Sequence, residues 1–160
     1  MGASMGQDQL GWGRATQMLA GDPGANASLA STIVEWKSLT QSNNLPFESY
    51  ARFLIAHPGW PSELALRRSA ERAIPAGGWS PTIAVAFFRR YPPLTNTARA
   101  AFAQALQATG ARDEAMLAAT SAWRAGALSA TDETAILTGF GGSLTPADQD
   151  ARMDALLWQG

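Results

Sequence analysis

Apolar residues recur every three to four positions in almost every interval between the turn-forming residues of this chain. That period places them on one face of an α-helix, whereas a half-buried β-strand needs a period of two. No run of β-branched residues alternates in the period of a strand. Alanine, which favours helices and lets their axes approach closely, fills 32 of the 160 positions. The sequence therefore predicts an all-α fold.

Turn residues divide the pattern into a series of helices. Ser80 with the proline after it starts one helix, Ser129 with Asp132 starts another as a capping box, and Gly110 and Gly126 end two more. The predicted helices span 9–20, 28–41, 47–56, 61–74, 81–91, 96–109, 112–125, 130–139 and 146–158. Because connections of about two to eight residues join antiparallel neighbours, we expect helix hairpins.

The clearest hairpin lies between residues 96 and 125. Its key positions are close to the spacing of a tetratricopeptide repeat, with a glycine at the turn and small residues between the helices: Phe102, Leu106, Gly110, Ala115, Ala119 and Ala122. The earlier hairpins, 28–56 and 61–91, do not repeat this spacing. The prediction is an α-α superhelix, a quasi-repetitive solenoid. We expect one domain over 9–160, after a flexible N-terminus or cloning remnant at 1–8.

Charge, apolar length and cysteine content exclude several functions. The net charge is −1, with 12 basic and 13 acidic side chains, which gives no positive surface for nucleic acid or an anionic membrane. No apolar run approaches the roughly 18 residues that a membrane-spanning helix needs. Cysteine is absent, so disulfides, thiolate catalysis and cysteine zinc sites are excluded. The N-terminal MGASMGQDQLGWG lacks the basic and apolar regions of a signal peptide.

Two places invite a catalytic interpretation. His57, the single histidine, stands before Pro58 at a predicted helix end, but a metal site or a catalytic triad would need further partners. The pair Glu48-Ser49 begins like the catalytic motif of lytic transglycosylases, yet the glycine-rich continuation of that motif is missing. We therefore predict a structural role for His57 and an exposed first-turn position for Glu48. No catalytic, cofactor-binding or metal-binding residue is assigned, and no cofactor is expected.

Arginine and tryptophan are the other candidates for binding. Five arginines form either a basic patch for an anionic polymer or a solvated face with local ion pairs, with Glu63 paired to Arg67 and Glu71 among the rest: Arg67, Arg68, Arg72, Arg89 and Arg90. Five tryptophans near helix ends are either packing residues or platforms for sugar rings: Trp36, Trp60, Trp79, Trp123 and Trp158. The ion-paired face and the packing role are preferred, and the glycan-contacting residues are left unassigned.

The last predicted helix begins with a strong start: Thr145 caps it, Pro146 fits its first position and Asp148 complements its dipole. We expect its apolar residues, Met153, Leu156, Leu157 and Trp158, to pack on the preceding helix around Ile136, Leu137 and Phe140. One flank of that stripe would still lack a neighbouring helix, as in a fragment of a longer chain. Extension by one hairpin should then raise the melting temperature and suppress self-association.

Two stretches resemble the N-terminal superhelical region of proteobacterial soluble lytic murein transglycosylases. The first is LPFESYARFLIAHPGWPSELALRRSAERAI (45–74), with an aromatic-rich helix, a Trp-Pro turn and an Arg-Arg helix. The second runs from PPLTNTARAAFAQALQATG to LTPADQDARMDALLWQG (92–160), with a Leu-Thr-Pro-Ala-Asp start and an Arg-x-Asp-x-Leu-Leu-Trp finish. The similarity covers the chain from about residue 28.

This resemblance implies a non-catalytic segment of a periplasmic enzyme that acts on peptidoglycan. The catalytic Glu of that family lies in a separate lysozyme-like domain, which forms a 1,6-anhydro sugar, and no residue here matches its motif. The implied partners are the rest of the parent polypeptide and peptidoglycan glycan strands. A free-standing helical-repeat adaptor for a protein or peptide is the alternative. A small helical enzyme is the third hypothesis, and no cluster of titratable residues supports it.

Overall fold

The computed structural model describes residues 23–160, and the predicted helix at 9–20 lies outside them. The chain divides into two compact units, residues 1–38 and 39–160. The described part of the first unit belongs to α2 (Pro23–Gln41), whose last turn reaches into the second unit. This helix includes residues 23–27, which the predicted start at 28 left out.

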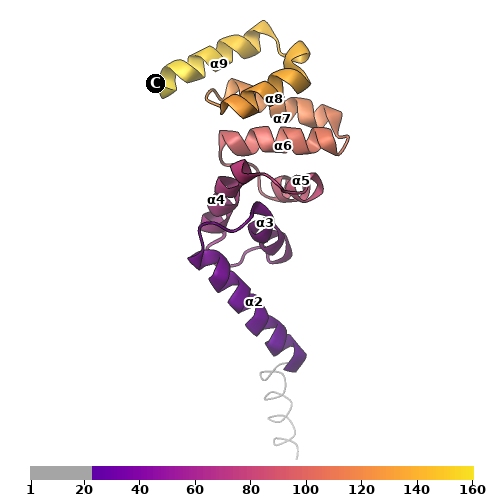
Figure 1. Ribbon diagram of the computed structural model, residues 1–160, viewed down its shortest axis with the longest axis vertical. Coiled ribbons are helices and arrows are strands. Elements are labelled where there is room, and N and C mark those ends of the chain that lie inside the picture. The colour runs from indigo at the N-terminus through magenta and orange to yellow at the C-terminus, as the bar shows by residue number, and fades with distance from the viewer. Residues whose placement is uncertain (1–22) are drawn as a thin grey trace, which may run out of the picture. The chain divides into compact units, whose positions relative to one another are not determined.

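The second unit consists of α-helices joined by short connections (Figure 1). They are α3 (Phe47–Ala56), α4 (Glu63–Ala73), α5 (Pro81–Arg90), α6 (Asn96–Ala108), α7 (Arg112–Arg124), α8 (Ala130–Phe140) and α9 (Pro146–Gln159), with 3-10 turns η1 (Ile74–Ala76) and η2 (Gly141–Ser143). The described residues therefore form eight α-helices packed mostly as adjacent hairpins, without a strand. The all-α prediction is confirmed, with helix bounds within a few residues. Whether residues 9–160 form one domain stays a prediction.

Aromatic side chains form the core between α3 and α5. The ring of Phe47 meets Phe87 edge-on at 5.4 Å between centroids and stacks on Phe88 at 5.9 Å. Two buried tyrosines join this core to the backbone, because the Tyr50 hydroxyl donates to Ser42 O and the Tyr91 hydroxyl donates to Leu54 O, both at 2.9 Å. Buried hydroxyls with partners cost little, so these tyrosines fix the hairpin geometry as well as filling space.

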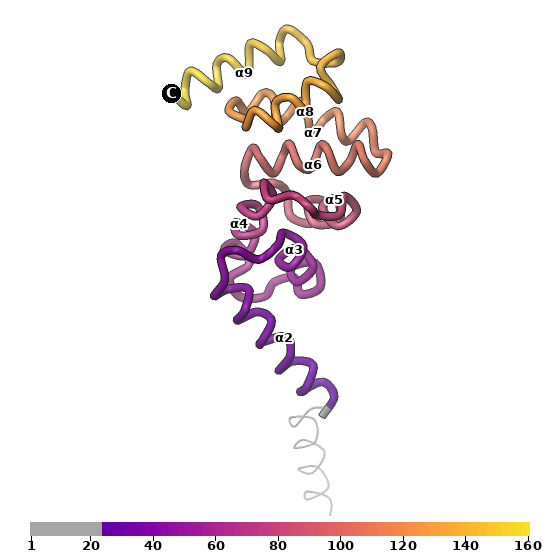
Figure 2. The backbone as a smooth tube through the Cα atoms, in the orientation of Figure 1, coloured from indigo at the N-terminus to yellow at the C-terminus, as the bar shows by residue number. Residues whose placement is uncertain are grey.

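Helices α6 and α7 form the closest hairpin, as the spacing predicts. Figure 2 shows the chain reversing between them, and Gly110 takes the left-handed φ of 86° that this turn requires. Ala115, Ala119 and Ala122 of α7 are fully buried against α6. Their small side chains let the two helix axes approach, and this part of the tetratricopeptide-like prediction is confirmed.

A buried carboxylate links the α4 end of the unit to the start of α6. Glu71 is 3% exposed and accepts hydrogen bonds from Leu94 N, Thr95 N and the Thr95 hydroxyl, at 2.7–2.8 Å. Thr95 in turn caps α6 through Ala98 N. Glu71, expected on a face with local ion pairs among the arginines, is bound instead by the loop donors before α6.

The prediction for the last helix is half right. Thr145 and Asp148 form a complete capping box, and Pro146 is the first helical residue, as expected. The predicted apolar stripe, however, does not pack on α8: Met153 is 62%, Leu157 78% and Trp158 91% exposed, and Leu156 is 40% exposed. The residues that α9 buries are Asp148 and Arg152, and its principal neighbour is α7.

The reason is a set of polar partners on α7 and α8. The Arg152 guanidinium lies 3.9 Å from the centre of the Trp123 ring and donates to Glu133 at 2.8 Å. Trp123 Nε1 donates to Gln149 at 3.1 Å, and the Gln159 amide donates to Ala125 O at 2.8 Å. These contacts set the rotation of α9 and turn its leucines outward.

Candidate functional site

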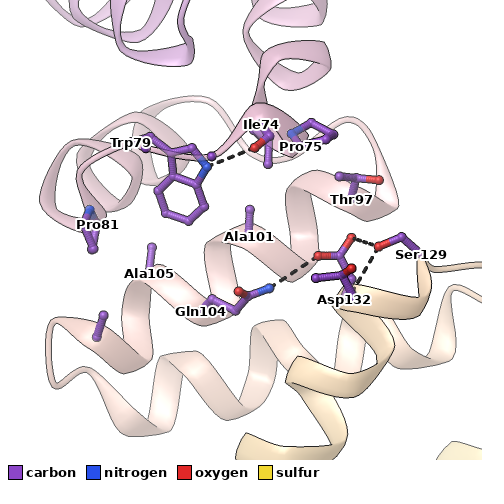
Figure 3. A pocket seen from close by; sticks show the side chains of 14 residues that line it. Ile74, Pro75, Trp79, Pro81, Thr97, Ala101, Gln104, Ala105, Ser129 and Asp132 are labelled. Atoms are coloured by element: carbon purple, nitrogen blue, oxygen red, sulfur yellow. Dashed lines mark hydrogen bonds between the residues drawn. The ribbon is translucent and has the colours of Figure 1, made fainter.

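A concave surface lies where the loop before α5 meets α6 and the start of α8. This cavity has a volume of about 660 Å³. We call it the Trp79 groove and define it by Trp79, Ala101, Gln104, Ala105, Ser129 and Asp132. Figure 3 shows Ala101 and Ala105 between Trp79 and the Gln104–Asp132 pair. Small-ligand sites fall in the range of about 300–1,000 Å³, so the groove has the size of a binding site.

Three contacts hold Trp79 and its loop in place. The Trp79 Nε1 donates to Ile74 O at 3.2 Å, and the Trp79 ring meets the edge of Phe47 at 6.2 Å between centroids. The next residue, Ser80, donates its backbone N–H to Glu48 at 2.6 Å. The two residues before Trp79, Gly77 and Gly78, have φ of 71° and 73°, which other residues rarely adopt. The contacts with Ile74 and Phe47 therefore hold the half-buried Trp79 side chain in place.

The opposite wall of the groove is polar. Gln104 of α6 donates to Asp132 of α8 at 3.5 Å, and the Ser129 hydroxyl donates to the other oxygen of Asp132 at 2.9 Å. The Asp132 backbone N–H donates back to Ser129 at 3.1 Å, which confirms Ser129 as the predicted cap of α8. The carboxylate charge is thus already engaged by a hydroxyl and an amide. The wall offers a ligand a carboxylate, a hydroxyl and an amide beside an aromatic ring.

A second hollow also borders this loop. It has a volume of about 340 Å³ and is lined by Phe47, Ser49 and Arg52, together with the Gly77–Trp79 segment that it shares with the Trp79 groove. We call it the Ser49 hollow. A Cβ built on either glycine would meet nothing within 4 Å, so the loop surface between the two hollows is open.

A third, more apolar depression of about 400 Å³ lies between α6 and α7. We call it the Leu117 groove and define it by Pro93, Arg99, Phe102, Leu106 and Leu117. Leu117 is 73% exposed, although it stands in the middle of α7. On the rim, Arg89 and Glu114 form an exposed ion pair at 2.7 Å.

The two catalytic candidates have structural roles. His57 is the residue after α3, as predicted, and its ring lies between Phe53 and Trp60, with centroids 4.8 and 5.4 Å away. Glu48 is in the first turn of α3, but the prediction that it is exposed is wrong: its side chain is 27% exposed and binds Ser80 N and Arg52. Its oxygens anchor the Trp79 loop, and Ser49 lines the hollow beside it.

The arginines do not pair as predicted. Arg67 donates to Pro92 O at 2.9 Å and lies over the Tyr91 ring, while Glu63 accepts from Gly59 N, so the expected i,i+4 pair is absent. Arg89 pairs with Glu114 of α7 instead of with a neighbour on its own helix. Arg67 and Arg89 thus bind partners that the tertiary fold brings close, and not neighbours on their own helices.

The tryptophans divide into two groups. Trp123 is buried under Arg152, and Trp36, Trp60 and Trp79 are half-buried, which agrees with the packing role for these four. Trp158, at 91% exposed, contradicts it. The sequence missed the polar wall: Gln104 and Asp132 are 28 positions apart, and only the closure of α6 on α8 brings them together. The sequence feature that points to this site is the Gly-Gly-Trp-Ser-Pro turn at residues 77–81.

Within residues 23–160, no group of three or more His, Asp or Glu side chains is placed to hold a metal ion. No helix of the described part combines the length and apolar character that crossing a bilayer requires. No family model, curated protein or solved structure matches the chain.

Proposed function

We propose that this chain is a non-catalytic α-superhelical segment of a periplasmic peptidoglycan lytic transglycosylase. In this proposal it scaffolds a ring beside a lysozyme-like catalytic domain carried by the rest of the parent polypeptide. The resemblance of 45–74 and 92–160 to that family is one support. The other is that the residues of those motifs hold helices together: Glu48 anchors the Trp79 loop, Trp60 packs on Phe53, and Arg152 joins α9 to α7 and α8.

The observation that carries the proposal is the packing of successive hairpins through fixed loops. Glu71 holds the start of α6, and the Asn96 amide donates to Ala122 O and Ala127 O at 3.0 and 2.8 Å. Such loop contacts make each hairpin a rigid neighbour of the next, which suits a scaffold built of stacked units. The finer assignment, an α-α superhelix, is part of this proposal.

The test is to incubate the purified chain with peptidoglycan sacculi. We expect the chain to sediment with the sacculi and to release no 1,6-anhydro-muropeptides detectable by mass spectrometry. Release of those products would overturn the non-catalytic assignment. A chain that stays in the supernatant would overturn the cell-wall assignment. If the parent chain did release those products, the Glu48→Gln variant would show whether the carboxylate of the Glu-Ser pair forms them.

A second candidate function is the helical-repeat adaptor, which the Leu117 groove favours. Its apolar floor, Phe102 and Leu106, lies beside Arg99, whose side chain has neither a hydrogen bond nor an ion pair in the structure. An apolar peptide side chain next to a carboxylate would complement it. In a phage-displayed peptide selection, we expect enriched peptides to lose binding to Leu117→Glu. Enrichment that is indifferent to this variant would remove the support for the adaptor.

A further inference from the structure

The Trp79 groove combines an aromatic ring with hydrogen-bonding groups on the opposite wall. The Trp79 indole is fixed through its own Nε1, and Gln104 and Ser129 lie across the groove. A sugar ring has one face of C–H groups, which packs on an aromatic face, and a rim of hydroxyls, which needs partners of the kind that this wall provides. The groove is therefore chemically matched to a pyranose ring.

The charges near the groove argue against an anionic ligand. Asp132 already accepts from Ser129 and Gln104, and Glu48 already accepts from Ser80 N and from Arg52 at 3.2 Å. Hydrogen bonds from the neutral Ser129 and Gln104 leave the negative charge of Asp132 in place. An anionic ligand would be repelled by this charge and by that of Glu48. An uncharged ligand avoids this repulsion, and its hydroxyls can donate to the remaining lone pairs of Asp132.

The Ser49 hollow adjoins the Trp79 groove. The two share Gly77, Gly78 and Trp79 in their lining, and a Cβ on either glycine would meet nothing within 4 Å. Each hollow by itself has the volume of a small-ligand site. A compact molecule would fill one hollow, whereas a linear polymer would fill both.

We propose that the Trp79 groove and the Ser49 hollow together bind an uncharged linear sugar strand, with one ring packed on Trp79. The identification of that strand as a cell-wall glycan rests on the proposed function, but the site itself does not. Affinity then increases with strand length until both hollows are occupied, because the second hollow adds contacts at little further entropic cost.

The experiment measures binding of β-1,4-linked N-acetylglucosamine dimer, tetramer and hexamer by isothermal titration calorimetry. We expect affinity to increase from dimer to hexamer. Thr131→Trp fills the Trp79 groove from an exposed position and should weaken binding of every oligomer about tenfold. The matched control is Thr138→Trp, the same substitution on an exposed position of α8 that lines neither hollow.

Ser49→Trp separates the two hollows. It should leave the dimer affinity unchanged and remove the extra affinity of the hexamer. Hexamer binding that Thr131→Trp leaves intact would overturn the Trp79 groove as the site, and a Ser49→Trp variant with full hexamer affinity would overturn the two-hollow arrangement. If either variant loses the helical circular dichroism of the parent, Trp79→Phe, with a smaller aromatic face, should still reduce affinity measurably.

The outcomes also separate this inference from the proposed function. A chain that sediments with sacculi but binds none of the oligomers overturns the sugar site and leaves the cell-wall assignment standing. A chain whose oligomer binding is blocked by Thr131→Trp, but which does not sediment with sacculi, keeps the site and overturns that assignment.

Discussion

Two contact surfaces of α7 are built on opposite principles. Against α6, the helix buries Ala115, Ala119 and Ala122, which have no polar side-chain atoms. Against α9, it meets Arg152 on Trp123, Gln149 on the Trp123 N–H and Asp148 near Arg124. The first contact depends on close approach and is sensitive to volume, while the second depends on charge and hydrogen bonds and is sensitive to pH and to single polar changes.

The largest expected effect tests the apolar contact. Ala119 is fully buried between α6 and α7, so Ala119→Leu has no space to enter and should destabilise the fold by about 3 kcal/mol. Chemical denaturation followed by circular dichroism measures it. Ala65→Leu, on an exposed position of α4, is the control and should stay within about 0.5 kcal/mol of the parent. Equal midpoints for the two variants would show that close approach of α6 and α7 does not matter.

The next effect tests the polar contact. Arg152→Met keeps an apolar stem over Trp123 but removes the cation, leaving Glu133 without its partner, and should cost about 2 kcal/mol. Arg124→Met removes a 54% exposed arginine that lies 3.5 Å from Asp148 and should cost about 1 kcal/mol or less. Denaturation midpoints of both variants measure the two losses of stability. A larger loss in Arg124→Met than in Arg152→Met would contradict the expected order.

Acid should release α9 while the α6–α7 contact holds. The Thr145 N–H and hydroxyl, with a smaller contribution from Arg124, lower the pKa of Asp148 below its ordinary value of 3.8, and burial opposes them. Because the folded-state pKa is lowered, the stabilisation of α9 is fully present above pH 3.8 and is lost as the pH falls through the lowered pKa. The buried alanines of α7 do not titrate, so acid should leave the α6–α7 contact in place.

The Trp123 indole N–H resonance reports this change, since its hydrogen bond to Gln149 ends when α9 leaves. We expect that resonance to shift below pH 3.8 while the α6–α7 amides stay protected. Asp148→Asn cannot titrate, so its indole resonance should show no acid step. A step of the same size in that variant would assign the change to another group.

The smallest expected effect concerns the outer face of α9. Trp158 is 91% exposed, so Trp158→Ser should change the free energy of unfolding by about 0.5 kcal/mol or less, unlike the buried Trp123. Trp123→Ser provides the comparison and should remove the platform for Arg152. A clear loss of stability in Trp158→Ser, measured by thermal denaturation, would show that the outer face of α9 is covered in solution.

Helix positions were predictable because their causes are local. Thr145, Ser129 and Gly110 act within one turn of their own position, and their capping or turning roles were confirmed. Partners of charged residues were not predictable from helical spacing. Glu63 and Arg67 stand at the right distance for an i,i+4 pair, which is worth about 0.3–0.5 kcal/mol, so competing partners from elsewhere in the fold easily displaced it.

The candidate site was visible in the sequence only as a Gly-Gly-Trp turn. Its other wall joins Gln104 to Asp132 across two helices, and no periodicity within one helix carries that information. Glu48 was set aside as an exposed acid, whereas it fixes the Trp79 loop from 32 positions away. Predictions of this kind fail because a hydrogen bond between distant segments depends on how the helices close on each other.

Local sequence patterns were enough to predict that the chain is helical, where its helices begin and end to within a few residues, and where the α6–α7 hairpin lies. These properties follow from period, capping and side-chain volume, which act over a few residues. Which face of α9 is buried depends instead on contacts between distant segments. The apolar stripe of that helix predicted burial of its leucines, but Trp123, Glu133 and Ala125 offered specific partners to Arg152 and Gln159. Paired charges and amides in fixed geometry then set the rotation of the helix, and the leucines and Trp158 were left facing outward.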